Sequence, residues 1–270
     1  MSDSRSAPSP DAMSPAGVRL DHVVVLVSSL AEATRTFTGA GFTVTPGGLH
    51  DAIPTENALV AFADGSYLEL LATRDPATRD ELRALRAGPG WERHLKGVSA
   101  IARRFLPALA RADGVADWVL GGAALGGRAA ALRALGVRSS GPATMARERT
   151  DRVRLEWQLL LPEAPLHPFW IADRTPRELR VPGGAAATAH ANGATGITAV
   201  RVRTPSVPTA ALALGEALGT MPRVRDGVST LELEGLRIEL VEGEPEGACG
   251  AQLAGCGPLP EAVTALGVTS

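Results

Sequence analysis

Hydrophobic and polar positions follow one order, strand-helix-strand-strand-strand, at the start of the folded chain. Residues 19–27 are a β-branched apolar run, which predicts a strand. Ser29 with Glu32 three residues later is the capping-box signature of a helix start. Two apolar runs then flank Asp64-Gly65, a dipeptide typical of hairpin turns. The early part of the chain therefore predicts a βαβββ module behind an N-terminal tail.

The same order returns twice later in the chain, which indicates repeated modules. In the second copy, the alternating positions 153 to 161 predict a half-buried hairpin strand. In the third copy, Glu234-Gly235 marks the hairpin, but no second strand is evident after the helix. We therefore divide the chain into a disordered tail (1–17), a first βαβββ module (18–75), a helical insert (76–113), a second βαβββ module (114–180), a linker (181–194), a third βαβββ-like module (195–243) and a C-terminal tail expected to be a loop (244–270).

Composition narrows the class of protein but not its function. The chain has 270 residues, of which 45% are hydrophobic and 21% charged, so disorder of the whole chain is excluded. No stretch approaches the roughly 20 apolar residues of a membrane helix, and the N-terminus lacks the apolar core of a signal peptide. A net charge of −2 gives no electrostatic footprint for nucleic acid or anionic lipid. We expect a cytoplasmic protein without nucleic-acid or membrane partners.

The first module also carries a family resemblance. The residues that carry it are Leu20-Asp21-His22-Val23-Val24-Val25-Leu26-Val27-Ser28-Ser29-Leu30, Phe42-Thr43-Val44-Thr45-Pro46-Gly47-Gly48 with His50, Glu56-Asn57-Ala58-Leu59 and Asp64-Gly65-Ser66-Tyr67-Leu68-Glu69-Leu70. They resemble the glyoxalase-like domain of the vicinal oxygen chelate superfamily, which includes glyoxalases, bleomycin resistance proteins and dioxygenases. The resemblance implies an α+β fold in which repeated βαβββ modules form a cupped, partly open barrel. It also implies a site on the concave face, where a divalent metal often chelates vicinal oxygens of a substrate.

His22 and Glu69 are the candidate metal ligands of the first module. Side chains alternate between the two faces of a strand, so His22 lies opposite its valine neighbours and Glu69 opposite its leucine neighbours. If the valines and leucines pack under the helix, both polar side chains point into the cup. The resemblance implies metal ligands at these positions. An imidazole with a carboxylate suits Fe, Mn, Zn, Co or Ni.

The sequence leaves the rest of the ligand set open. Aligning the helix starts places Asp117 and Phe169 of the second module opposite the two first-module candidates. A phenylalanine cannot bind a metal, so a third ligand would be Asp117 or the nearby His167. Pairing with the third module would instead offer Glu239. Since a catalytic metal usually has three protein ligands, the sequence does not decide whether a metal is bound.

His50 is the candidate catalytic residue, because it follows a Gly-Gly turn where backbone approaches closely and loops carry function. It would act as an acid or base, and the alternative is a solvated loop histidine. Asn57, Tyr67 and His167 are candidate substrate-binding residues. Packing within the strands is the alternative for Asn57 and Tyr67, and His167, which precedes a proline at a strand edge, is ambiguous.

We therefore expect a glyoxalase-like enzyme of the lyase, isomerase or dioxygenase type that acts on a small molecule. Its cofactor, if it has one, would be a divalent metal. Without a metal, His22 and Glu69 would position the substrate while His50 moves a proton. The alternative is a metal-free protein of the same fold that binds a small molecule, as antibiotic-sequestering proteins do. The sequence is compatible with either a monomer or a homodimer.

Overall fold

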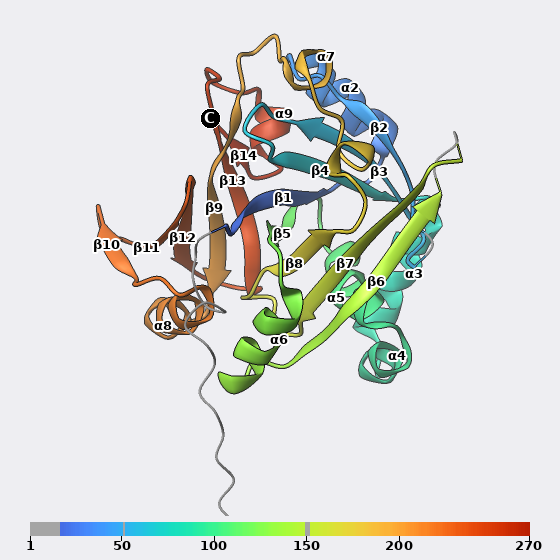
Figure 1. Cartoon of the computed structure of the whole chain (residues 1–270). Coiled ribbons are helices and arrows are strands. Elements are labelled where there is room, and N and C mark those ends of the chain that lie inside the picture. The colour runs from blue at the N-terminus through green and yellow to red at the C-terminus, as the bar shows by residue number, and fades with distance from the viewer. Residues whose placement is uncertain (1–16, 51, 149–151) are drawn as a thin grey trace, which may run out of the picture.

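The computed structural model describes residues 17–50, 52–148 and 152–270. The tail expected over 1–17 lies outside these ranges except for Gly17. Within them, helices and strands combine into an α+β fold with two β-sheets (Figure 1). No helix in the described ranges is long and apolar enough to cross a membrane.

The first module has the expected βαβββ order. Its elements are β1 (Arg19–Leu26), α2 (Leu30–Gly39), β2 (Thr45–Leu49), β3 (Thr55–Ala61) and β4 (Tyr67–Thr73). The capping residue of α2 is Ser29, whose side chain accepts a hydrogen bond from the backbone N–H of Glu32 at 3.3 Å. Strands β1 and β4 are parallel neighbours, and His22 lies level with Tyr67. The strand-helix-hairpin pattern of the sequence is therefore realised in space.

The insert and the second module follow in chain order. The insert consists of α3 (Pro76–Ala87), α4 (Trp91–Gly97) and α5 (Ala100–Leu109). The second module consists of β5 (Gly114–Gly121), α6 (Leu125–Ala134), β6 (Ser139–Glu148), β7 (Arg154–Pro162) and β8 (Phe169–Asp173). Strands β5 and β8 are parallel neighbours, as β1 and β4 are, so the second module repeats the first.

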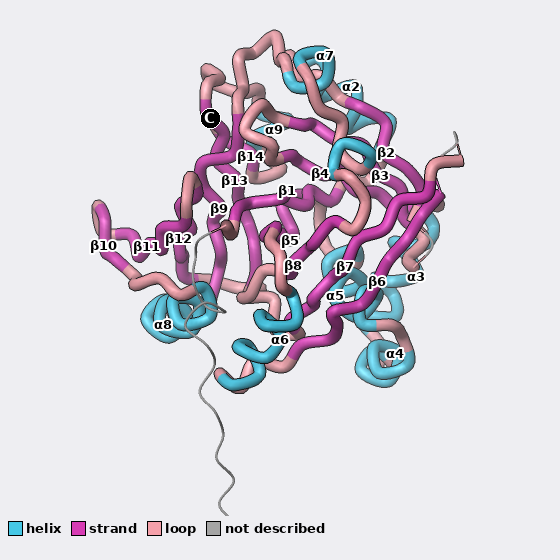
Figure 2. Tube along the Cα trace, in the orientation of Figure 1, coloured by secondary structure: helices cyan, strands magenta, loops and turns pink. Residues whose placement is uncertain are grey.

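The first two modules join through β1 and β5, which pair antiparallel. The result is one curled eight-stranded sheet with the order β2-β3-β4-β1-β5-β8-β7-β6 (Figure 2). Because each module contributes one half, the concave face of the sheet is shared between them. This is the cupped barrel that repeated βαβββ modules were expected to form.

The two faces of this sheet belong to different hydrophobic cores. The convex face, which includes the fully buried Val23 and Val25, packs against α2, α6 and the C-terminal sheet. The concave face, which includes Val24 and Leu26, packs against the insert, where Phe105 of α5 is buried. Burial on both faces explains the continuous apolar run in β1. Helix α5 therefore fills one part of the cup.

The third module contributes four strands to a separate six-stranded sheet. Its elements are β9 (Gly196–Thr204), α8 (Val207–Leu218), β10 (Arg223–Arg225), β11 (Val228–Leu233) and β12 (Leu236–Glu242), preceded by η1 (Arg177–Leu179) and α7 (Ala185–Thr188). Strands β9 and β12 are parallel neighbours, so the βαβββ order recurs here too. The three-residue strand β10 is the second strand that the sequence did not reveal.

The C-terminal segment is not a loop, contrary to the expectation for residues 244–270. It contains β13 (Gly247–Ala254), α9 (Glu261–Thr264) and β14 (Val268–Thr269). Strand β13 pairs antiparallel with β9, just as β5 pairs with β1, and it also lies beside β5 (Figure 1). Glycine and alanine have low strand propensity, so the composition of β13 concealed a strand that its pairing with β9 creates.

Candidate functional site

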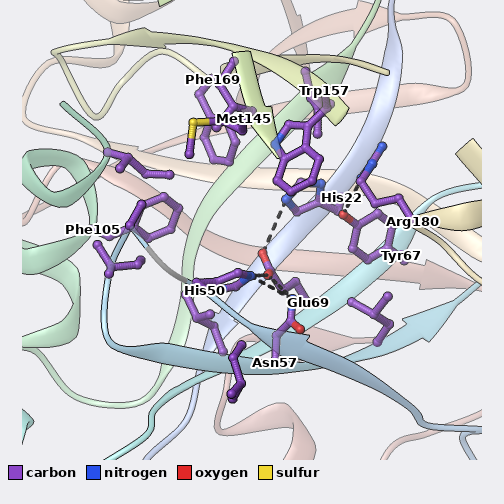
Figure 3. A pocket seen from close by; sticks show the side chains of 18 of the residues that line it. His22, His50, Asn57, Tyr67, Glu69, Phe105, Met145, Trp157, Phe169 and Arg180 are labelled. Carbon is purple, nitrogen blue, oxygen red and sulfur yellow. Dashed lines mark hydrogen bonds and ion pairs between the residues drawn. The ribbon is translucent and has the colours of Figure 1, made fainter. Parts of the chain in front are cut away.

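A cavity of about 140 Å³ lies on the concave face between the first two modules. Its size is comparable to that of cavities that hold a benzene-sized molecule. Its polar wall consists of His22, His50, Asn57, Tyr67 and Glu69, all from the first module, together with Arg180. Its aromatic walls come from the insert and the second module, with Phe105, Trp157 and Phe169 (Figure 3). The first module thus supplies most of the polar chemistry, and the other segments shape the space.

Glu69 lies at the centre of the polar wall, where its side chain is 11% exposed. Its Oε2 lies 3.5 Å from His22 Nε2, and its Oε1 lies 3.7 Å from His50 Nε2. The amide of Asn57 donates a hydrogen bond to Oε1 at 2.5 Å. His22 and Glu69 therefore converge in one cavity, as their shared strand face predicts. A nearly buried carboxylate needs such polar partners, so the four side chains form one cluster.

Asp21 holds the far side of the His22 ring, with its Oδ1 2.7 Å from His22 Nδ1. This contact assigns the proton to Nδ1 and leaves Nε2 towards Glu69 and the cavity. Arg180 and Arg177 both form ion pairs with Asp21. Burial alone would raise the pKa of Asp21, but Arg180, His22 and Arg177 outweigh it and hold that pKa well below its ordinary value. Asp21 is therefore a permanent carboxylate that orients His22.

Asn57 connects Glu69 to His50. Its Oδ1 accepts a hydrogen bond from the backbone N–H of Gly48 at 2.8 Å, so its Nδ2 points towards Glu69. That Nδ2 also lies 3.4 Å from His50 Nε2, while Thr55 Oγ1 lies 2.9 Å from His50 Nδ1. The arrangement fits a neutral His50 that donates from Nδ1 and accepts at Nε2. Asn57 therefore sets the orientation of both neighbours.

Gly47 and Gly48 lie in strand β2 and not in the turn expected before His50, and the strand leaves no room for a side chain at position 47. A Cβ atom on Gly47 would overlap the amide oxygen of Asn57. We expect Gly47→Ala to destabilise the protein by about 1–3 kcal/mol, the usual effect of overpacking, because Asn57 or strand β2 has to move. Gly39→Ala is the matched control, since no atom lies within 4 Å of its Cβ position. Chemical denaturation measures both variants, and equal free energies of unfolding would contradict the prediction.

Tyr67 forms the wall next to His22. The two rings stack, with centroids 4.5 Å apart and planes inclined by 19°. The Tyr67 hydroxyl oxygen accepts a hydrogen bond from Arg180 at 2.9 Å. Burial, together with the carboxylates of Asp21 and Glu69, raises the pKa of Tyr67 well above its ordinary value, although Arg180 acts in the opposite direction. Tyr67 is therefore a neutral phenol that can donate a hydrogen bond.

The second module does not complete a metal site. Phe169 lines the cavity at the position expected to correspond to Glu69. Both oxygens of Asp117 accept hydrogen bonds from Arg104 at 2.7 Å, and one also accepts the backbone N–H of Trp118 at 2.8 Å. In the described part of the chain, no group of three His, Cys, Asp or Glu side chains could hold a metal ion. The described residues therefore do not make up a metal-ligand set, and Asp117 is instead an anchor for helix α5.

Two other residues that the sequence singled out lie away from the cavity. The backbone oxygen of His167 accepts a hydrogen bond from Arg104, and its buried Nδ1 has no hydrogen-bond partner among the described residues. Glu239 lies in the C-terminal sheet and pairs with Arg201 and Arg237. Because the first module pairs with the second and not the third, Glu239 cannot join Glu69. The structure therefore offers His167 no place at the substrate cavity.

The stability of the protein should depend on His167 in mild acid. Burial, with a contribution from Arg104, lowers the pKa of His167 to about 4 in the folded state. The unfolded chain protonates His167 near its ordinary pKa of about 6.5, so stability falls as the pH drops from about 6.5 to 4, by about 3 kcal/mol in total. We expect His167→Phe to flatten this slope and His94→Ala, on α4, to keep it. Denaturation at several pH values measures the slopes, and parallel curves for His167→Phe and wild type would refute the expectation.

Three residues of the cavity wall could not be identified from the sequence. Arg180 is one of many arginines in the chain, and no motif surrounds it. Phe105 lies in the insert, which has no counterpart in the modules. Trp157 lies on a strand whose alternation of apolar and polar residues is evident in the sequence. Which face of that strand lines the cavity depends on how the modules pair. Only the assembled structure identifies these residues.

Comparisons with solved structures agree with this architecture. A protein from Staphylococcus aureus described as hypothetical superposes with a TM-score of 0.67 at 17% identity, over 87% of this chain and 90% of that chain. A mutant of 4-hydroxymandelate synthase from Streptomyces coelicolor gives a TM-score of 0.54 at 12% identity, over 88% and 71% of the two chains. A xylose isomerase-like TIM barrel/4-hydroxyphenylpyruvate dioxygenase fusion protein gives 0.53 at 11% identity, over 87% and 36%. At these identities the likeness shows the fold alone.

Sequence comparison identifies the family. No curated protein matches the chain significantly. A family model described as a glyoxalase-like domain matches residues 20–218, which include the first two modules, the insert and part of the third module. The matched range contains every polar residue of the cavity wall. The chain therefore belongs to the glyoxalase-like domain family of the vicinal oxygen chelate superfamily.

Proposed function

We propose that this protein is a small-molecule enzyme of the isomerase or lyase type, in which His50 transfers a proton while His22 and Glu69 position the substrate. The observation that carries the proposal is the convergence of these side chains, with Asn57, on one cavity that is otherwise mostly apolar. An apolar cavity with a few convergent polar groups is the usual setting of small-molecule chemistry. Membership of the glyoxalase-like family supports the same class of function.

His50 is the group best placed to move the proton. Its side chain is 25% exposed, against 5% for His22, so a bound molecule can reach it more easily. Thr55 accepts a hydrogen bond from Nδ1 in the assigned tautomer, which leaves Nε2 as the basic atom. In an isomerisation, Nε2 would take a proton from one substrate carbon and return it to a neighbouring atom. Such a step balances without another reactant.

The other polar residues hold the substrate in this proposal. The Tyr67 phenol would donate a hydrogen bond to a substrate oxygen, which stabilises negative charge that develops there. Glu69 would accept a hydrogen bond from a substrate N–H or O–H group. His22 would be held in place by Asp21, whose own charge is fixed by Arg180. Each residue thus has a role that its present contacts leave available.

No step of this proposal uses a metal, because no ligand set for one is found among the residues that the structure describes. We expect that addition of Mn, Fe, Zn, Co or Ni to the protein, after treatment with a chelator, leaves its melting temperature unchanged. An ion that binds only the native state would raise the melting temperature. Thermal unfolding with EDTA and with each ion measures the effect. A rise in melting temperature that His22→Ala and Glu69→Ala both abolish would contradict the prediction and indicate a metal site.

The enzymatic proposal is tested by deuterium exchange into candidate substrates in D₂O. Aryl and alkyl ketones and aldehydes with a C–H bond next to the carbonyl group are incubated with the protein, and mass spectrometry detects deuterium uptake. We expect the protein to catalyse exchange in at least one compound. After heat denaturation of the protein, exchange in that compound should return to the spontaneous rate. Exchange that never exceeds the spontaneous rate would count against proton transfer.

The alternative function is the binding of a small molecule without reaction. It is favoured by Phe169, which stands where a ligand residue was expected, and by the ion pair of Asp117 with Arg104. The same compounds separate the two functions. Compounds that raise the melting temperature but never exchange deuterium support binding alone, whereas exchange that depends on His50 supports the enzyme.

A further inference from the structure

The charged side chains of the cavity wall differ in how many hydrogen-bonding groups they leave for a ligand. Arg180 is the only guanidinium among the described residues that line the cavity. Its Nε and one terminal nitrogen donate to Asp173 at 2.7 and 2.9 Å, and its two terminal nitrogens donate to Asp21 at 3.2 and 3.0 Å. Its remaining N–H group donates to the Tyr67 hydroxyl at 2.9 Å. All five donors of Arg180 are therefore engaged, and none is left for an anionic substrate.

Glu69 has acceptor capacity that its neighbours do not fill. A carboxylate offers about four acceptor positions, and the Asn57 amide occupies one of them. The separation between Oε2 and His22 Nε2 is 3.5 Å, which is longer than a well-formed hydrogen bond. A carboxylate only 11% exposed beside apolar walls is stabilised by a further donor, most strongly by a cationic one.

The walls facing Glu69 are aromatic. Trp157 and Phe169 lie across the cavity from Glu69 and His50, and Phe105 stands at its side (Figure 3). Phe105 and Phe169 pack edge to face, with centroids 5.8 Å apart. The faces of aromatic rings carry partial negative charge, so they attract a cation and repel an anion. The cavity volume of about 140 Å³ accommodates one aromatic ring with a short side chain.

We infer that the cavity takes a small aromatic amine in its protonated form, with the ammonium group on Glu69 and the ring against Trp157 and Phe169. The inference deepens the proposed function, whose substrate would be a carbonyl compound that also carries an aromatic ring and a protonated amino group, and it rests on the assignment of Glu69 as a positioning residue. It disfavours carboxylates and phosphates as ligands, because the described residues of the cavity wall offer them no unengaged guanidinium. His50 remains the proton-transferring group, so the ion pair with Glu69 does not compete with it.

Three probes of the same shape test the charge preference by isothermal titration calorimetry. They are 2-phenylethylamine, 2-phenylethanol and phenylacetate, which carry a cationic, a neutral and an anionic group. We expect the amine to bind at least about 10-fold more tightly than phenylacetate. Glu69→Gln should weaken amine binding by about 10- to 100-fold, the range of a lost charge-assisted hydrogen bond, and leave binding of the alcohol within about 3-fold.

Glu239→Gln is the matched control. Glu239 is a partly exposed carboxylate on β12, paired with Arg201 and Arg237 outside the cavity, so its loss should leave all three affinities unchanged. Retained binding of 2-phenylethanol shows that Glu69→Gln is folded, and Glu69→Asp should keep the preference for the amine.

Three results would overturn the inference: phenylacetate binding as tightly as the amine, no amine binding at millimolar concentration, or amine binding that Glu69→Gln does not weaken. Because these titrations measure binding and not turnover, any of them would leave the deuterium-exchange assay to decide separately on proton transfer by His50.

Discussion

Replacement of His50 with alanine is expected to slow substrate deuterium exchange by about 10²- to 10⁴-fold, the range typical of a lost general acid or base. The reason is that His50 Nε2 faces the cavity 3.7 Å from Glu69, in a tautomer suited to accept a proton. The side chain is a quarter exposed, so we expect the free energy of unfolding to change by less than about 1 kcal/mol. The His50→Ala variant should therefore lose its exchange activity while keeping nearly the stability of the wild type.

The matched control for His50→Ala is His94→Ala. His94 stacks on Trp91 of α4 and does not line the cavity, so its loss should leave the exchange rate unchanged. Initial rates of deuterium uptake at several pH values, with denaturation curves for each variant, provide the measurement. Full activity in His50→Ala combined with loss in Glu69→Gln would assign the base to Glu69 and contradict our assignment.

The strand alternation of the sequence predicts the polar wall well. Because side chains alternate on a pleated strand, one assumption about the helix-covered face was enough to place His22 and Glu69 in the same cavity. The assumption holds because Val23 and Val25 pack against α2. Such local periodicity survives folding whenever both faces of a strand are covered by different layers.

The partners of these groups could not be predicted in the same way. Asp117 has the strand position that the module alignment gives it, but its charge is taken up by Arg104 of the insert. Arg180 is the last residue of the second module and yet binds Asp21 of the first. Both contacts join segments distant in the chain, and ion-pair choice at such distances depends on tertiary packing and not on any local pattern.

The two modules differ in a way that explains the site. In the first, the concave positions carry His22, Tyr67 and Glu69, whereas the second places Phe169 on the same cavity. The insert then covers the neighbouring concave positions with α5, and Arg104 neutralises the carboxylate that remains there. The cavity is therefore polar at one end and aromatic at the other, which is an arrangement suited to one molecule held in one orientation.

Arg180 is expected to have the largest effect on stability. It is buried, and its five donors hold Asp21, Asp173 and Tyr67 together. Removal of one partner of a buried ion pair usually destabilises a protein by about 3–5 kcal/mol, since it leaves an uncompensated charge. Arg177 also pairs with Asp21, so we place Arg180→Met near the lower end, at about 3 kcal/mol.

Denaturation at pH 7 measures this effect, with Arg35→Met as the control, because the Arg35 side chain is 71% exposed. The second substitution Asp21→Asn should restore part of the loss in Arg180→Met, since a neutral amide needs no cation, and the double-mutant cycle gives the coupling between the two residues.

The pKa of Asp21 lies below its ordinary value in the wild type, so its contribution to stability is present above about pH 4 and is lost as the pH falls further. In Arg180→Met the Asp21 carboxylate loses its ion pair with Arg180. The difference in the free energy of unfolding between this variant and the wild type should therefore shrink in acid, where Asp21 is protonated. A variant no less stable than Arg35→Met at pH 7 would show that Arg177 alone compensates Asp21.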